Sequence, residues 1–242
     1  MIHPLKPYKK TFGHSYVFGA FAVYELLNAR PENALAVHIH SNFTDKKKLA
    51  ELCAKKNIQV IFGDKVFDRV AQKESPLVFA VFSKYSMDLE SLKPHICLIN
   101  PMDMGNLGCI LRSMAAFAFE NLAIITPGAD IFDPKTVRAS MGAIFRISFR
   151  MFGSFDEYMG AFPGRTLFPF MTEGSQILDP LFRPREPYTL IFGNEAAGLP
   201  ESFAALGQSL RIPQTGAVDS LNLSVAVSIG MYEFMTAIAD VL

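Results

Sequence analysis

Hydrophobic residues fall along the chain in short runs, and longer segments with helical spacing separate these runs. The runs rich in β-branched and aromatic residues predict strands at 35–40, 58–62, 77–82, 96–100, 122–126, 146–149, 166–171, 188–192 and 209–212. The segments with helical spacing predict helices at 15–29, 44–56, 64–72, 106–119, 134–145 and 221–239. Strands that alternate with helices are typical of an α/β fold with a mainly parallel sheet.

The pattern breaks between residues 83 and 95, which are polar and contain Pro94. A polar, proline-containing stretch before a new buried strand is typical of a boundary between domains. The length of 242 residues also suits two compact units better than one. We therefore expect a small α/β domain at 1–88 and a second domain at 95–242.

Composition narrows the class of protein. Hydrophobic residues make up 50% of the chain and charged residues 19%, which excludes intrinsic disorder. The formal net charge is zero, so the whole chain has no general attraction to nucleic acid or to a membrane. Residues 1–90, however, carry 13 basic and 9 acidic side chains, whereas residues 91–242 carry 10 and 14. This asymmetry indicates an interaction surface on the first part of the chain.

Cysteine spacing and hydropathy indicate the cellular compartment of the protein. The three cysteines, Cys53, Cys97 and Cys109, form no Cys-x-x-Cys pair, so we expect neither a disulfide framework nor a metal site. The first residues lack the apolar stretch of a signal peptide, and Glu233 interrupts the longest apolar segment. We expect a cytoplasmic protein that does not span a membrane.

Two common nucleotide-binding patterns are missing. No Gly-x-Gly-x-x-Gly follows a predicted strand, which argues against a Rossmann dinucleotide site or a Rossmann-type methyltransferase. The stretch from Gly193 to Gly198 has the glycine spacing of a P-loop. Leu199 and Pro200 follow it, however, where a P-loop needs lysine and serine or threonine, which argues against an NTPase.

Three segments place glycines and polar residues directly after a predicted strand, where open α/β sheets bind ligands. In the first, residues 100–112, Asn106 is expected to cap a helix that carries Arg112, whose guanidinium suits phosphate or carboxylate. The alternative is an ordinary capped helix with a solvated arginine. In the second, residues 190–200, Gly193 would let a ligand approach the backbone and Glu195 could orient a base, unless the segment is an ordinary turn.

The third segment, residues 212–224, presents Ser220 and Asn222 before a helix rich in small residues. Capping explains one of these polar side chains but not both. Together the three segments, in this order, resemble the signature motifs of the SpoU/TrmH family of RNA ribose 2′-O-methyltransferases, in the SPOUT superfamily. The matching stretches are Asp103-Met-Gly-Asn-Leu-Gly-Cys-Ile-Leu-Arg112, Gly193-Asn-Glu-Ala-Ala-Gly-Leu199 and Ile212 to Ser224.

The resemblance covers about residues 95–242, including Pro134 to Gly142, which is similar to a segment of the ribosomal-RNA members. The sequence departs from the family pattern at Met104, Ala196 and Gln214, and none of these changes removes a polar residue of the motifs. Residues 1–88 are similar in length and element order to the L30e-like substrate-binding domain of many relatives, mainly through residues 17–27.

The resemblance implies a fold, a cofactor and a set of site residues. The fold is an α/β-knot, in which a parallel sheet flanked by helices ends in a trefoil knot. The cofactor is S-adenosylmethionine, in a pocket that would include Gly193, Ile212 and Leu221. The residues implied for catalysis are Arg112, Asn106, Glu195, Ser220 and Asn222. Because a free arginine stays protonated, we interpret Arg112 as a stabiliser of the forming alkoxide and an anchor for phosphate.

The resemblance also implies partners. The substrate is structured RNA, with ribosomal RNA of the 23S type preferred to transfer RNA, and no metal is expected. Candidate phosphate contacts are Lys46, Lys47, Lys48, Lys135 and Arg138, although solvated helix faces would explain them equally. The helix at 221–239 is apolar around much of its circumference, which predicts a homodimer. A transfer-RNA methyltransferase and a noncatalytic RNA-binding protein on the same fold remain the alternatives.

Overall fold

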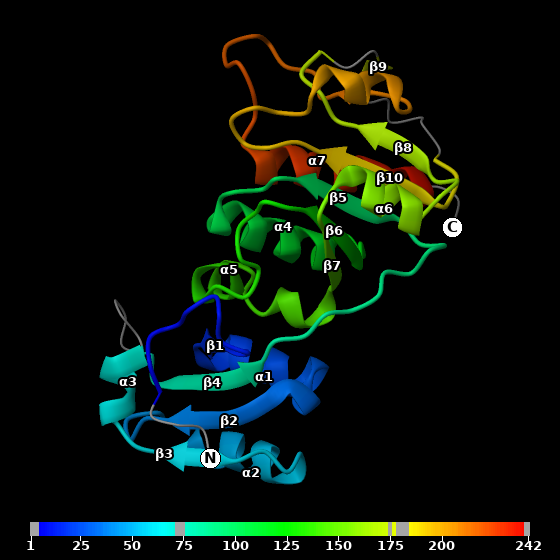
Figure 1. Cartoon of the computed structure of the whole chain (residues 1–242). Coiled ribbons are helices and arrows are strands. Elements are labelled where there is room, and N and C mark those ends of the chain that lie inside the picture. The colour runs from blue at the N-terminus through cyan, green and yellow to red at the C-terminus, as the bar shows by residue number, and fades with distance from the viewer. Residues whose placement is uncertain (1–4, 71–75, 174–175, 178–183, 240–242) are drawn as a thin grey trace. The chain divides into compact units, whose positions relative to one another are not determined.

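A computed structural model describes residues 5–70, 76–173, 176–177 and 184–239. Its contacts divide the chain into two compact units (Figure 1). The first unit contains residues 1–85 and 130–146, and the second contains residues 86–129 and 147–242. The first boundary lies close to the end of the expected domain at 1–88. The segment 130–146, which the motifs associate with the second domain, makes its contacts with the first unit.

The first unit is built on a four-stranded sheet with the order β1-β4-β2-β3. The strands are β1 (His14–Phe18), β2 (Ala34–Ile39), β3 (Val60–Phe62) and β4 (Val78–Ser83). Only β2 and β3 are parallel, whereas β4 runs antiparallel to both β1 and β2. The expectation of a mainly parallel sheet is therefore wrong for this unit. Tyr16 and Phe79 are buried in its core, together with Phe67.

The helices of the first unit connect and cover these strands. They are α1 (Ala20–Ala29), α2 (Lys46–Lys55), α3 (Lys65–Val70) and α5 (Pro134–Ala139), with 3₁₀ turns at Pro31–Asn33 and Ala143–Arg146. The predicted helix at 15–29 starts too early, because residues 15–18 belong to β1. The predicted helix at 134–145 is interrupted after Ala139. The end of the predicted helix at 64–72 lies outside the described residues.

The second unit contains a five-stranded parallel sheet with the order β7-β6-β5-β10-β8 (Figure 1). Its strands are β5 (His95–Ile99), β6 (Asn121–Ile125), β7 (Ser148–Phe152), β8 (Thr166–Pro169) and β10 (Tyr188–Phe192). Every residue of β5, β6 and β10 is buried, which explains why these strands are continuous hydrophobic runs in the sequence. A short parallel pair, β9 (Gln176–Ile177) and β11 (Leu210–Arg211), stands apart from this sheet.

The described residues of the second unit form the helices α4 (Met104–Ala116), α6 (Phe155–Ala161) and α7 (Leu223–Ala239). A 3₁₀ turn lies at Glu201–Ala205. Helix α7 packs on β10 and on α4. A Cβ on Gly230 would lie 2.9 Å from the ring of Phe170 and 3.0 Å from that of Phe192, so glycine lets α7 approach the sheet. Within the described residues no helix has the length and hydropathy needed to span a membrane.

Candidate active site

The site lies at the point of the parallel sheet where the order in which strands are added reverses, between β5 and β10. From β5 the chain proceeds to β6 and then β7 on one side, and β10 enters the sheet on the other side of β5. Such a switch point leaves a crevice at the carboxyl ends of the two central strands. Residues 100–106 follow β5 and residues 193–198 follow β10, so the fold brings the first and second motifs to this crevice.

The first motif is held by the start of α4. Asp103 is the N-cap of this helix, and its Oδ1 accepts a hydrogen bond of 2.7 Å from the backbone N of Asn106. The prediction that Asn106 caps the helix is therefore wrong. Met104 is the first helical residue, a position that favours proline but accepts other residues. Because Asp103 does the capping, the amide side chain of Asn106 is available for other partners.

The second motif forms a tight loop. Asn194 and Gly198 exchange two backbone hydrogen bonds of 3.1 and 2.9 Å. A Cβ on Gly193 would lie 2.1 Å from the carbonyl carbon of Gly198, so any side chain there would collide with the backbone of the loop. From the sequence, this glycine was expected to let a ligand approach the backbone. The structure shows that the loop itself already requires it.

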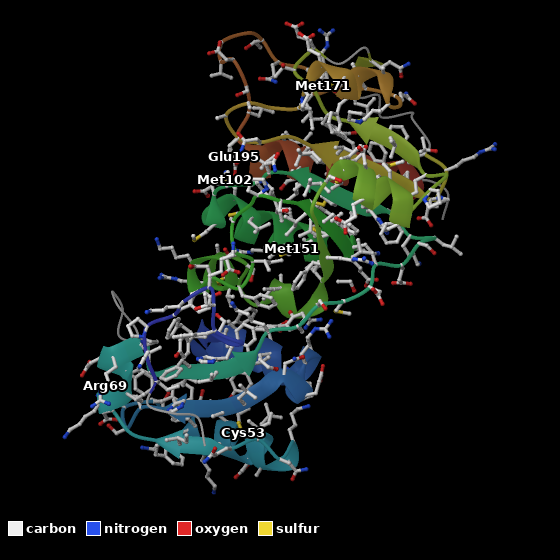
Figure 2. All side chains as sticks on the ribbon, in the orientation of Figure 1. Cys53, Arg69, Met102, Met151, Met171 and Glu195 are labelled. Carbon is white, nitrogen blue, oxygen red and sulfur yellow. The ribbon has the colours of Figure 1, made fainter. Side chains whose placement is uncertain are left out.

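Glu195 connects the two motifs (Figure 2). Its Oε2 accepts a hydrogen bond of 3.0 Å from the backbone N of Met102, and its Oε1 accepts one of 2.9 Å from that of Asp103. Burial alone would raise the pKa of this carboxyl group. The hydrogen bonds that it accepts from backbone N–H groups outweigh the effect of burial and lower the pKa. Glu195 is therefore an ionised acceptor near neutral pH.

A chain of amide side chains extends from Glu195 to the third motif. Asn106 Nδ2 donates to Glu195 Oε1 over 3.4 Å, and Asn222 Nδ2 donates to Asn106 Oδ1 over 2.9 Å. Asn222 Oδ1 accepts from the backbone N and the hydroxyl of Ser224, at 2.9 and 2.7 Å. Because the carboxylate can only accept, it fixes which end of each amide donates. Three residues predicted from separate motifs thus form one oriented cluster.

A pocket of about 430 Å³ lies beside this cluster. The predicted residues Gly193, Ile212, Leu221, Ser220 and Glu195 all line it. Its other walls include the apolar side chains of Phe192 and Leu223 and the carboxylates of Glu173 and Glu201. Apolar walls, accessible backbone and several acidic groups suit a flat organic ligand that carries positive charge. The described residues contain no cluster of three or more side chains that could hold a metal ion.

Arg112 lies apart from the pocket of its own chain. It is exposed on α4, and it is not among the residues that line the pocket. Six positions separate it from Asn106, which places the two side chains on different faces of the helix. The structure therefore does not bring Arg112 into the hydrogen-bonded cluster.

The predicted phosphate contacts all belong to the first unit. Lys46, Lys47 and Lys48 are exposed on α2, and Lys135 and Arg138 are exposed on α5. Helix α5 packs on β1, one edge strand, whereas Lys46 and Lys47 border a groove beside β3, the other edge strand. The five side chains therefore do not form one continuous patch.

Further residues, not predicted from the sequence, belong to the site. Asn194 Nδ2 donates to Asn100 O at 2.8 Å, and its Oδ1 accepts from Ala196 N and Ala197 N. An asparagine directly after a strand and a glycine was the available signal, since this side chain often bonds nearby backbone. Phe170, Met171 and Thr172 follow β8 and form another wall of the pocket. Their position at the end of a predicted strand was the corresponding signal.

Known proteins match this chain over both units. The chain is 29% identical over 195 residues, 76% of this chain and 72% of the relative, to the 23S rRNA (adenosine(1067)-2'-O)-methyltransferase of Streptomyces laurentii. It is 29% identical over 144 residues, 57% of this chain and 85% of the relative, to the putative tRNA (cytidine(34)-2'-O)-methyltransferase of Listeria monocytogenes. The structure of the AdoMet-bound rRNA methyltransferase from Sinorhizobium meliloti aligns with a TM-score of 0.78 and 25% identity, over 95% of this chain and 88% of that one.

The model of the SpoU rRNA Methylase family matches residues 93–232. This range contains Glu195, Asn106 and Asn222 and the residues that line the pocket. It also covers more than half of the chain. The chain therefore belongs to the SpoU rRNA methylase family.

Proposed function

We propose that the protein is an S-adenosylmethionine-dependent methyltransferase that acts on a ribose 2′-hydroxyl of ribosomal RNA. One observation carries this proposal: the ionised Glu195, which lines a pocket, orients Asn106 and through it Asn222, in a chain of the SpoU family. An oriented amide cluster beside a cofactor-sized pocket suits a reaction in which positioning of the reactants supplies much of the rate.

The pocket fits the proposed cofactor. Gly193, Ile212 and Leu221 provide backbone groups and apolar contacts for an adenosine moiety, and the carboxylates of Glu173, Glu195 and Glu201 complement positive charge. The volume of about 430 Å³ lies within the usual range of small-molecule sites. S-adenosylmethionine would supply an electrophilic methyl group there. Gln214, where the family usually has methionine, also lines the pocket and adds an amide.

The residues of the cluster have distinct proposed roles. Glu195 holds Asn106 in one orientation, and Asn106 in turn holds Asn222, so the cluster presents fixed dipoles to the substrate. Ser220 is exposed at the rim, where its hydroxyl can bond the ribose. The role of the Arg112 guanidinium is to stabilise negative charge on the ribose oxygen and to bind a neighbouring phosphate. The proton of the hydroxyl leaves to solvent or to the RNA phosphate.

We also propose a homodimer, and the position of Arg112 supports it. Because this residue lies outside the pocket of its own chain, we propose that it completes the pocket of a second copy. Two side chains on the apolar helix α7, Val225 and Tyr232, are 45% and 49% exposed. Val227, Met231 and Phe234 are buried within the unit, while the side chain of Ile238 lies outside the described residues. The exposed face of α7, together with neighbouring α4, is the proposed interface.

The first unit is proposed as the RNA-docking domain, similar to L30e, with Lys46, Lys47, Lys48, Lys135 and Arg138 as its phosphate contacts. The share of this chain that each relative matches favours ribosomal RNA. The match to the 23S rRNA methyltransferase covers more of the chain than the match to the transfer-RNA relative does. The proposal includes a trefoil knot around the pocket and action in the cytoplasm, where ribosomes are assembled.

Methyl transfer from labelled S-adenosylmethionine tests the proposal. We expect transfer to deproteinised 23S ribosomal RNA, and we expect calorimetry to show that the cofactor binds in the absence of RNA. If only transfer RNA were methylated, the substrate would be transfer RNA and not ribosomal RNA. Cofactor binding without transfer to any RNA would support a noncatalytic RNA-binding protein, and failure to bind the cofactor would overturn the proposed pocket.

A further inference from the structure

Phe62 is an exposed aromatic residue at the edge of the first unit. It ends β3, the outer strand of the sheet, and its side chain is 61% exposed. A single exposed hydrophobic side chain is common on protein surfaces and indicates nothing by itself. The surroundings of Phe62 are what give it meaning.

Phe62 lines an open groove of about 900 Å³ beside α2 (Figure 1, where β3 and α2 carry labels). Ala50 and Ala54 of α2 border the same groove. They lie one turn apart on the helix, so they share a face, and their small side chains leave space next to the aromatic ring. The groove is therefore open to a flat group that could stack on Phe62.

The charges around the groove favour an anion. Lys46, Lys47 and Glu51 line it, and the excess of positive charge comes from the segment around them: residues 45–56 contain five lysines against two acidic residues, Asp45 and Glu51. The carboxylate of Asp64 also borders the groove, but it is engaged: it accepts hydrogen bonds from the backbone N and the hydroxyl of Ser41, at 2.9 and 2.8 Å. Lys46 Nζ donates to Ser41 O at 3.0 Å, which holds this lysine at the entrance.

We propose that this groove binds one unpaired nucleotide of the RNA substrate, with its base stacked on Phe62 and its phosphates near Lys46 and Lys47. This inference rests on the proposed function for its ligand class. An aromatic face next to lysines is the combination that single-stranded nucleic acid requires, because the base has a flat apolar surface and the backbone is anionic. A purely apolar partner would not use the lysines, and a phosphate alone would not use the ring.

Direct binding tests the groove without relying on methyl transfer. The probe is a single-stranded oligoadenylate that contains 2-aminopurine, since stacking on an aromatic residue depends little on the base. We expect the full-length protein to quench the probe, and Phe62→Ala to weaken binding by about 5- to 100-fold. Phe62→Trp should restore it. Phe21→Ala is the matched control, because Phe21 is 60% exposed on α1 and lies outside the groove.

Equal affinity of Phe62→Ala and wild type would overturn the proposal, as would equal losses in Phe62→Ala and Phe21→Ala. So would an absence of binding to the wild-type protein. If Phe62→Ala instead reduced the mass measured by light scattering and left RNA affinity unchanged, the groove would be an interface between copies of the chain.

Methyl transfer separates this inference from the proposed function. If wild type methylates ribosomal RNA but Phe62→Ala has the same KM for it and the same probe affinity, only the groove is wrong. If wild type transfers no methyl group while the probe still binds in a manner dependent on Phe62, the groove is supported and the proposed function fails. Lys46→Gln with Lys47→Gln should flatten the dependence of probe affinity on salt.

Discussion

The two ends of the parallel sheet in the second unit both carry hydrogen-bonded polar side chains, but in opposite environments. At the carboxyl ends, Asn106 and Asn222 form a cluster with Glu195 that is partly open to solvent. At the amino ends, Arg165, His95 and Thr189 are almost fully buried, with exposed fractions of 6%, 0% and 0%. The polar groups at the amino ends therefore hold the structure together, whereas those at the carboxyl ends can meet a ligand.

The hydrogen bonds of the buried network at the amino ends form a chain with one consistent order of donors and acceptors. Arg165 Nε donates to Thr189 Oγ1 at 2.9 Å, and Thr189 and Tyr158 share a hydrogen bond of 2.7 Å. Tyr158 in turn bonds His95 Nδ1 at 3.0 Å, and His95 Nε2 lies 2.9 Å from Glu90 O. A neutral His95 that donates from Nε2 satisfies every member. Histidine and arginine therefore mark a candidate site only where the fold leaves them accessible.

The largest expected effect is on stability. Arg165→Met removes a guanidinium that also donates to three backbone carbonyls, those of Ser91, Lys93 and Tyr188. Each buried carbonyl left without a partner costs about 1–3 kcal/mol, so we expect the free energy of unfolding to fall by at least about 3 kcal/mol. Urea unfolding measures it. The folded fraction should keep its affinity for S-adenosylmethionine, and a loss of that affinity would mean that the two ends of the sheet are coupled.

Arg112→Ala should lower turnover and leave stability unchanged, the reverse of Arg165→Met. We expect turnover to fall by at least about 10²-fold with unchanged cofactor affinity and unchanged stability, because the guanidinium acts on the ribose oxygen and the RNA phosphate and not on the cofactor. Single-turnover kinetics and calorimetry measure the two quantities. Arg150→Ala is the control, since Arg150 pairs with Asp88 elsewhere in the second unit. Parallel losses of cofactor affinity and turnover would instead place Arg112 in the cofactor pocket.

Glu195→Gln should have a smaller effect. The substitution places an NH₂ group against one of the backbone N–H donors of Met102 and Asp103, so the orientation of Asn106 is no longer fixed. We expect turnover to fall by about 10-fold. Glu157→Gln tests specificity, because Glu157 also accepts a backbone N–H, that of Gly153 at 2.7 Å, but lies outside the pocket. Similar losses in both variants would show that any carboxylate on the backbone has this effect.

The carboxyl ends of the sheet could be predicted from the sequence and the amino ends could not. The first two motifs follow β5 and β10, which are continuous hydrophobic runs, so position after a strand indicated these segments. The resemblance to the family motifs then assigned Asn106, Glu195 and Asn222 to the site. The cap at Asp103 was missed because Asp103 and Asn106 are both good capping residues. Residues 15–18 fit a helix and a strand equally well, and only pairing with β4 decides between them. The network of His95 and Arg165 depends on contacts between distant segments, which periodicity cannot show.

The smallest expected effect is on the pH dependence of stability, which differs between the two ends of the sheet. Burial lowers the pKa of His95 from 6.5 to about 4, with the nearby charge of Arg165 contributing in the same direction. The unfolded chain therefore binds more protons between these values, so stability is complete above about pH 6.5 and is lost as the pH falls toward 4. Glu195, whose pKa is lowered, loses its contribution only below the ordinary glutamate value of about 4.3. The two ends thus titrate in different windows.

Urea unfolding at pH 7 and pH 5 tests this separation. We expect wild type to lose about 1 kcal/mol or more of its free energy of unfolding between these values. His95→Gln should lose less, because glutamine does not titrate. His38, in the first unit, has its pKa lowered to about 4 by burial and titrates in the same window, so His38→Gln reports the share of that unit. Glu195→Gln should leave the difference between pH 7 and pH 5 unchanged. If it removed that difference, the acid sensitivity would arise at the open end of the sheet and not in the buried network.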